Sequence, residues 1–353
     1  MKGNLTNYPR QAQLFISEVC MEGCDYCPYT QMPQKEKKKL LVRELSIEQW
    51  QQAVEFLNRW LGIKLFFLIG GEPTAKKGVE RLIDFMSHKL SGVNVVLSTS
   101  GISVLRDKKQ RQTLVRAGAN KFVVSIDRLD DKSKKTDWSD LVGREKGSER
   151  KSLLGLRFLQ ILRQDFPKVD FILSANSIIN KKTLPDILKT YFFLAKQQIY
   201  LNLCPEQTLC FDHQTTALDG QDQQQLRKIV RELVKIKQQE NNFLIPSTRF
   251  LQLLPTLGIG QMYKCSSAPF PLTLHLASDG TIPFCIWRRG ELANQFNVMD
   301  WVRGKKDYSQ WLKAWQNDQG GRGCSCSWSF IDRVGGFGIS RGREKNNFWH
   351  NLI

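Results

Sequence analysis

Short apolar runs that alternate with amphipathic helical segments constrain the fold of this 353-residue chain more than any other feature. One apolar run ends just before Cys20, and five more cover residues 64–69, 93–97, 122–126, 171–173 and 199–203. Helical patterns separate them near residues 47–61, 79–89, 108–117, 152–163 and 184–196, and a further amphipathic helix is expected over 222–237. Ser46, with Gln49 three residues on, is expected to cap the first of these helices. Strands that alternate with helices usually pair in parallel, so the sequence predicts an α/β fold with a parallel sheet and crossover helices.

Polar clusters stand at the carboxyl end of each predicted strand. They cover residues 20–27, 70–74, 98–101, 125–127, 174–176 and 202–206. Because the carboxyl ends of parallel strands meet at one edge of the sheet, these clusters are expected to form one site. In contrast, residues 31–43 are polar and basic without helical periodicity, and we expect a surface loop there.

The first polar cluster contains three cysteines within eight residues, Cys20, Cys24 and Cys27. With Gly23 to permit a tight turn, three thiolates at this spacing are suited to hold one corner of an iron–sulfur cube. Such a cube keeps one iron without a protein ligand. A structural zinc site is the alternative, although zinc usually takes a fourth ligand near by.

The Cys-x3-Cys-x2-Cys spacing, with Tyr26 before the third cysteine, resembles the signature of the radical S-adenosylmethionine (radical SAM) superfamily. The resemblance implies a 4Fe-4S cluster whose open iron binds SAM, and an external electron donor such as flavodoxin or ferredoxin. SAM would be cleaved to a 5′-deoxyadenosyl radical that takes a hydrogen from a substrate C–H bond. It also implies a partial (β/α)6 TIM-like barrel, expected over residues 1–240.

The Gly70-Gly71-Glu72-Pro73 stretch resembles the second motif of the same family, in which exposed backbone carbonyls bind the SAM ammonium group. A plain strand-to-helix turn is the alternative. By the same resemblance, Tyr26 is expected beside the adenine, and Ser125 and Asp127 in contact with SAM. Arg144 or Lys146, in the charged segment 131–151 that follows, is a candidate to bind the SAM carboxylate or an anionic group of the substrate. A solvated loop is the alternative for this segment.

Four further cysteines lie in the last quarter of the chain: Cys265, Cys285, Cys324 and Cys326. A hairpin with its turn at Asp279-Gly280 is expected before Cys285. The spacing resembles the twitch form of the SPASM extension of radical SAM enzymes, which implies an auxiliary 4Fe-4S or 2Fe-2S cluster in residues 241–330. A four-cysteine zinc site is the alternative. Residues 331–353 are expected to be a tail that either brings Arg333 or Arg341 to the substrate or is poorly ordered.

Two other cysteines, Cys204 and Cys210, follow the sixth strand. A thiol at the open side of the barrel is a candidate hydrogen-atom donor to a carbon radical. The alternative is that both are small buried apolar residues.

The composition indicates the cellular compartment but does not identify the substrate. Nine cysteines without a signal peptide indicate reduced thiols, and without a long apolar run we expect a soluble cytoplasmic protein with no membrane partner. The net charge of +18 attracts anions of many kinds. A peptide or protein is the favoured substrate. A small metabolite or nucleotide is the second candidate and RNA the third, and a non-catalytic iron–sulfur or zinc protein is the remaining alternative.

Overall fold

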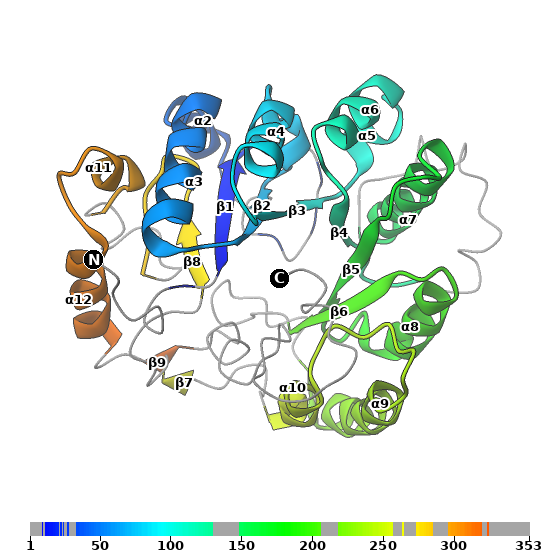
Figure 1. Cartoon of the computed structure of the whole chain (residues 1–353). Coiled ribbons are helices and arrows are strands. Elements are labelled where there is room, and N and C mark those ends of the chain that lie inside the picture. The colour runs from blue at the N-terminus through cyan, green and yellow to red at the C-terminus, as the bar shows by residue number, and fades with distance from the viewer. Residues whose placement is uncertain are drawn as a thin grey trace.

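The computed structural model of the chain describes residues 9, 11–20, 22, 24, 27, 33–129, 148–205, 218–256, 263–264, 273–284, 296–319 and 323–324. Within these ranges, seven parallel strands form one sheet in the order β6-β5-β4-β3-β2-β1-β8. Figure 1 shows that the sheet curls into an open barrel with its helices on the outer side. The expected α/β partial barrel is confirmed.

The six predicted strands are present. They are β1 (Gln11–Ser17), β2 (Leu65–Gly70), β3 (Asn94–Thr99), β4 (Lys121–Ser125), β5 (Ile172–Ile179) and β6 (Tyr200–Pro205). The strand expected at 171–173 is longer than its apolar run, because the polar residues Ser174, Asn176 and Ser177 continue the ladder.

The seventh strand, β8 (Thr273–Leu276), pairs in parallel with β1. The predicted hairpin over this region is therefore wrong in its pairing, although its turn is present, with Gly280 at φ +80°. After the turn, Thr281 pairs with Asn297, so the described return segment does not form a ladder with β8. The side chain of Gln11 reaches Thr273 at 2.6 Å, which joins two segments at opposite ends of the chain.

Helices connect the strands at the expected places. The longer ones are α3 (Ile47–Leu61), α4 (Val79–His88), α6 (Lys108–Arg116), α7 (Ser148–Asp165), α8 (Ile187–Lys196) and α9 (Gly220–Lys237). Short helical segments are η2 (Pro73–Ala75), α5 (Ile102–Leu105), η5 (Leu184–Asp186), α10 (Thr248–Leu253) and η8 (Leu254–Thr256). A capping box at Ser46 and Gln49 starts α3, as predicted, and Gly62 ends it in the left-handed conformation.

Residues 31–43 were expected to be a surface loop, and this expectation is wrong. The structure places α2 at Gln34–Val42. Its lysine, glutamate and leucine residues have high intrinsic helix propensity, whereas the exposed Leu41 and Val42 show that its apolar residues do not all face the core. The helix therefore lacks the apolar periodicity by which buried helices are recognised.

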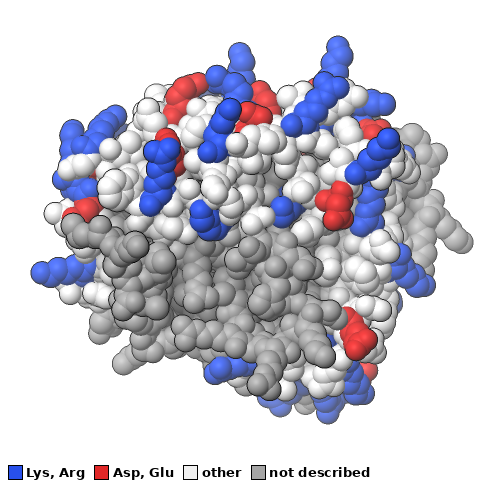
Figure 2. All heavy atoms as spheres, viewed as in Figure 1, with Lys and Arg blue, Asp and Glu red and all other residues white. Residues whose placement is uncertain are grey.

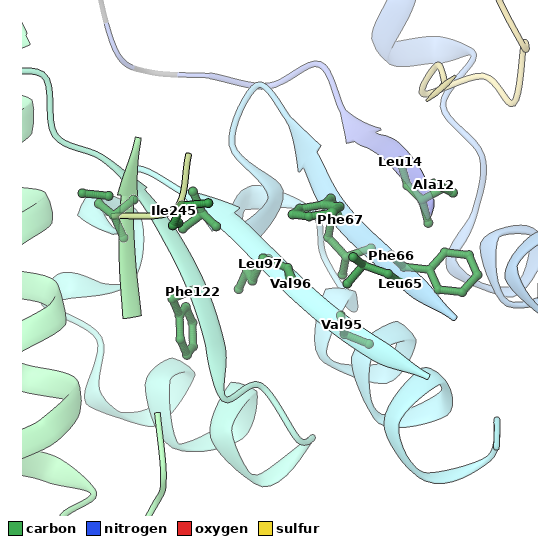
Figure 3. Packing of buried hydrophobic residues seen from close by; sticks show 14 of the residues in the cluster. Ala12, Leu14, Leu65, Phe66, Phe67, Val95, Val96, Leu97, Phe122 and Ile245 are labelled. Carbon is green, nitrogen blue, oxygen red and sulfur yellow. The ribbon is translucent and has the colours of Figure 1, made fainter. Parts of the chain in front are cut away.

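The core lies between the sheet and these helices. Figure 3 shows side chains of β1, β2, β3 and β4 in this layer, among them Leu14, Phe66, Leu97 and Phe122. Phe122 meets Phe158 of α7 edge to face, with ring centroids 5.7 Å apart. These contacts fix the helices against the sheet, so the loops at the carboxyl ends of the strands rest on a rigid frame.

An aromatic group joins the C-terminal helices α11 (Val298–Val302) and α12 (Tyr308–Gln319) to the barrel. The ring centroids of Trp301 and Phe56 of α3 lie 6.4 Å apart, and Trp311 stacks on both Tyr308 and Trp315. The indole of Trp311 also donates a hydrogen bond to the carbonyl of Ile282 at 3.1 Å.

A second, two-stranded sheet pairs β7 (Tyr263–Lys264) with β9 (Gly323–Cys324) in antiparallel fashion. The helices that the structure describes include none long and apolar enough to cross a membrane.

Candidate metal centre

The cysteine loop leaves the carboxyl end of β1. Cys20, Cys24 and Cys27 are half-buried and free of disulfides. The amide of Cys27 donates to the carbonyl of Cys24 at 3.1 Å, which closes a tight turn. Burial raises the pKa of the Cys20 thiol to about 11, with smaller contributions from the negative charges of Glu72, Cys27 and Cys24. Cys24 and Cys27 thus lie near enough to Cys20 to influence its ionisation.

The loop after β2 lies directly against the end of β1. The amide of Gly71 donates to the carbonyl of Ser17 at 2.8 Å, and that of Glu72 donates to Val19 at 2.6 Å. A Cβ on Gly71 would lie 2.3 Å from the Val19 carbonyl oxygen and 3.1 Å from the Cβ of Cys20. Glycine at this position therefore lets the two loops touch.

Glu72 is buried and organises its surroundings. Its carboxylate accepts hydrogen bonds from the amide and hydroxyl of Thr74, the hydroxyl of Thr99, and the amide and hydroxyl of Ser100. Both carboxylate oxygens of Glu72 thus accept hydrogen bonds from the loops after β2 and β3. Glu72 is predicted to be a cofactor-binding residue. Its described contacts show that it also supports the cysteine loop, because it connects Val19 to the loops after β2 and β3.

Glu44 supports the cysteine loop from the other side, and the sequence pattern did not single it out. Its Oε1 accepts hydrogen bonds from the amide of Glu18 at 2.6 Å and the hydroxyl of Ser17 at 3.2 Å. Its Oε2 pairs with Lys76 at 2.7 Å. Glu44 precedes the capped helix α3, and no periodic pattern in the sequence marks it.

The first turns of α7 also reach the cysteine loop. The ammonium group of Lys151 lies 3.4 Å from the sulfur of Cys24 and 3.0 Å from a carboxylate oxygen of Asp127. On the same turn, Arg150 pairs with Glu22 at 3.8 Å. Lys151 is the last residue of the charged segment in which Arg144 and Lys146 were considered. The sequence pattern did not single it out, because we expected the helix to begin at Ser152, whereas α7 begins at Ser148.

The charges of this group influence one another. Burial alone would lower the pKa of Lys151, but Asp127 and Cys24 outweigh it and raise that pKa. Burial raises the pKa of Cys24, while the positive charge of Lys151 opposes the rise. The lysine therefore favours the thiolate form of Cys24.

Polar side chains form a row across three neighbouring strands. The strand register places Ser125 of β4 beside Asn176 of β5, and Asn176 beside Asn202 of β6. The amide of Asn202 donates to Asn176 at 2.9 Å and lies 3.5 Å from the sulfur of Cys204. Burial raises the pKa of Cys204 to about 12, so its thiol stays protonated at neutral pH.

Several predicted site residues lie outside the described part of the chain. They are Tyr26, Arg144, Lys146, Cys210, Cys265, Cys285, Cys326, Arg333 and Arg341. For Cys324 the backbone is described, and it pairs with Tyr263, two positions before Cys265 in the sequence. Ser125 and Asp127 both lie at the carboxyl end of β4, on the same edge as the cysteine loop.

The described residues suit an iron–sulfur cube. Three free thiols stand on one loop beside a glycine turn and a buried lysine that favours thiolate. In the part of the chain that the structure describes, no three His, Cys, Asp or Glu side chains converge on a single metal ion. A cube has no need of such convergence, because each thiolate binds a different iron.

An α/β partial barrel with three free thiols on a loop at its carboxyl edge is suited to hold an iron–sulfur cluster at the mouth of the barrel. Residues 14–172 match the family model of the Radical SAM superfamily.

Curated relatives named GTP 3′,8-cyclase match part of the chain. The protein of Campylobacter fetus subsp. fetus is 29% identical over 130 residues, which cover 36% of this chain and 37% of that protein. The protein of Tolumonas auensis is 29% identical over 194 residues, covering 54% of this chain and 51% of that protein. The matched regions thus span about a third to a half of these relatives.

Solved structures match more of the chain at lower identity. Streptococcus suis SuiB bound to S-adenosylmethionine has a TM-score of 0.60 at 15% identity, over 88% of this chain and 66% of SuiB. The anSMEcpe complex with AdoMet and the Cp18Cys peptide has a TM-score of 0.57 at 17% identity, over 98% of this chain and 94% of anSMEcpe. These similarities show a shared fold.

Proposed function

We propose that this protein is a radical SAM enzyme that cleaves SAM reductively and abstracts a hydrogen from a C–H bond of a peptide or protein substrate. The observation that carries the proposal is the contact between the cysteine loop and the Gly70-Gly71-Glu72 loop at the carboxyl ends of β1 and β2. In this arrangement the cysteine loop and the Gly70-Gly71 backbone lie against each other, as a cluster with SAM on its open iron requires.

The chain's own residues have distinct tasks in this proposal. Cys20, Cys24 and Cys27 hold the 4Fe-4S cluster, which supplies the electron for SAM cleavage. The Gly70-Gly71 backbone binds the SAM ammonium group, and Tyr26, Ser125 and Asp127 complete the cofactor site. Pro73 and the hydrogen bonds of Glu72 keep the Gly70-Gly71 backbone in one conformation, which spares the binding step an ordering cost.

The C-terminal cysteines are proposed to hold an auxiliary 4Fe-4S or 2Fe-2S cluster within residues 241–330. The pairing of β7 with β9 supports this proposal, since it aligns the backbone of Cys324 with the residues just before Cys265. Phe284, which precedes Cys285 in the sequence, packs against Trp311 with ring centroids 6.0 Å apart. Residues beside three of the four cysteines thus belong to one C-terminal region.

A peptide substrate is supported by the fold similarity to SuiB with its precursor peptide and to anSMEcpe with a bound peptide. Cross-linking, epimerisation and oxidation are the reactions proposed for it, with flavodoxin or ferredoxin as electron donor. Cys204, protonated and close to the Asn176 and Asn202 pair, is the proposed hydrogen donor if the product requires one.

A nucleotide is the second candidate substrate, because the matching curated relatives are named GTP 3′,8-cyclase. RNA has only the basic charge in its favour. On the face shown in Figure 2, Lys and Arg side chains are spread over the helices with acidic side chains among them, without a single continuous basic patch.

One anaerobic experiment tests the catalytic proposal. Protein reconstituted with iron and sulfide is mixed with SAM and dithionite, and 5′-deoxyadenosine is measured by liquid chromatography. We expect 5′-deoxyadenosine from the wild type and none from Cys24→Ala. A wild-type protein that binds only zinc, or forms no 5′-deoxyadenosine with its cluster loaded, would contradict the proposal in favour of a non-catalytic protein.

The substrate is tested by comparing GTP with a peptide encoded by a short reading frame beside the gene. A peptide substrate should increase 5′-deoxyadenosine formation, while GTP should leave the rate at its background. The peptide should change in mass or, if the reaction is an epimerisation, take up deuterium when the reaction is run in D2O. The reverse result would assign the protein to nucleotide chemistry.

A further inference from the structure

Lys151 occupies a position that is unfavourable for a cation. It is 3% exposed and stands in the first turn of α7, where the helix dipole is positive. Burying an ammonium group costs several kcal/mol unless charged partners compensate it. The chain keeps a buried cation here, which makes the lysine a candidate functional residue.

Among the described contacts of the ammonium group, two carry the argument. One is the carboxylate of Asp127, which is 1% exposed and follows β4, at 3.0 Å. The other is the sulfur of Cys24, at 3.4 Å, from a loop 127 residues earlier in the chain. Lys151 therefore joins the segment after β4 to the cysteine loop. In the ion pair of Lys151 with Asp127, the positively charged member contacts the sulfur of Cys24.

Asp127 is itself held in place. Its amide donates to the hydroxyl of Ser152 at 2.9 Å, and its carbonyl accepts a hydrogen bond from the hydroxyl of Ser177 at 2.8 Å. The carboxylate thus has a fixed position between α7 and β5. A lysine against a fixed carboxylate has little freedom to turn away from Cys24.

We propose that Lys151 raises the reduction potential of the cluster by donating a hydrogen bond to the Cys24 thiolate, and that Asp127 positions this ammonium group and moderates its charge. The inference rests on the proposed function, because it requires Cys24 to be a cluster ligand. Reduction adds negative charge to the cluster, so a cation that contacts a ligand sulfur stabilises the reduced form. Lys151 acts through Cys24 and needs no contact with SAM or substrate.

An electrostatic role of this ion pair differs from a purely structural role in the direction of two shifts of the cluster's reduction potential. Removing the positive end of the pair should make reduction harder, whereas removing the negative end should make it easier. A pair that only holds α7 against the loop would disturb the cluster in the same way whichever partner is removed.

The experiment is a redox titration of the reconstituted full chain without SAM, followed by electron paramagnetic resonance, with iron content measured in each sample. We expect Lys151→Met to lower the midpoint potential and Asp127→Asn to raise it. The double variant, which buries no charge, should have a lower midpoint than Asp127→Asn, and it keeps the test available if Lys151→Met does not fold.

Arg150→Met is the matched control. It removes a positive charge from the neighbouring position, which pairs with Glu22 rather than with a cysteine. We expect a smaller shift than with Lys151→Met, because the effect depends on contact with the ligand sulfur.

The inference is overturned if Lys151→Met and Asp127→Asn shift the potential in the same direction, if neither shifts it, or if Arg150→Met matches Lys151→Met. Failure of the wild type to assemble an iron–sulfur cluster would overturn the proposed function as well. A fully loaded set of variants with unchanged potentials would overturn the inference alone.

Discussion

Oε2 of Glu72 accepts hydrogen bonds from both the amide, at 2.8 Å, and the hydroxyl, at 2.7 Å, of Ser100. Ser100 follows β3, so this carboxylate connects the loops at the ends of two neighbouring strands. Through its own amide, Glu72 also binds Val19 in the loop that leads to Cys20. The geometry of the cysteine loop therefore depends on a residue that was predicted for its place in a cofactor motif.

Glu72→Gln should lower the free energy of unfolding by about 1–3 kcal/mol, because the amide nitrogen replaces an acceptor and leaves buried donors without a partner. Urea unfolding followed by circular dichroism measures the change. Glu240→Gln, on an exposed turn, is the control and should have no measurable effect. Equal stability of the two variants would contradict the role of Glu72 in supporting the cysteine loop.

Gly71→Ala should lower stability by about 1–3 kcal/mol, since the new Cβ would meet the Val19 carbonyl and force the two loops apart. Iron uptake on reconstitution should fall with it. The control is Gly220→Ala, where a Cβ has no neighbour within 4 Å. Gly220 is the first residue of α9, and alanine there should be neutral or slightly stabilising. Full iron uptake by Gly71→Ala would be inconsistent with the close contact.

Trp311→Ala should lower the free energy of unfolding by about 3–5 kcal/mol, because it leaves a cavity in the core and removes the stacking with Tyr308 and Trp315. Trp60→Ala is the matched control. Trp60 is 73% exposed whereas Trp311 is 2% exposed, so the control should change stability by no more than about 0.5 kcal/mol. Chemical denaturation of both variants decides the matter, and similar costs would refute the assignment of Trp311 to the core.

The N-terminus of α9 should contribute a pH-dependent term to stability. The side chain of Lys181, and next the amides of Asp222 and Gln221, lower the pKa of Asp219 to about 2. Because this folded-state pKa is below the unfolded value of about 3.9, the contribution is present above pH 4 and is lost as the pH falls toward 2.

Asp219→Asn keeps a capping side chain but cannot ionise, so its stability should fall less steeply between pH 4 and 2. Thermal unfolding at several pH values measures this slope. Lys181→Met is the companion variant and should flatten the same part of the profile. Parallel profiles for wild type and Asp219→Asn would rule out the contribution.

Local sequence patterns predicted most of the barrel. The apolar runs that became β2, β3 and β4 are short and flanked by glycine or polar residues, and their ladder partners are the next strands along the chain. The capping box at Ser46 predicted the start of α3 because its hydrogen bonds join residues only three apart. In contrast, α2 was missed, since helix propensity without an apolar stripe leaves no periodic signal.

The candidate site was predictable only in part. The cysteine loop and the glycine turn are each contiguous, so their spacing identified them. Glu44, in the connection between α2 and α3, and Lys151, in α7, are single residues that reach the loop from separate parts of the chain, and no local sequence pattern predicts their contacts. Asp127 was predicted at the carboxyl-terminal edge of the sheet, where the structure places it, but its pairing with Lys151 depends on where α7 packs.

Strand length, helix period and cysteine spacing are local properties, so the amino-acid sequence alone predicts the class of fold and the cysteine-loop motif. The pairing of β8 with β1, the bridge that Glu72 makes between two loops and the contact of Lys151 with Cys24 become known only from the folded chain. These contacts join segments up to 262 residues apart. Such pairs are chosen by the curvature of the sheet and the packing of helices on it, which no short stretch of sequence specifies.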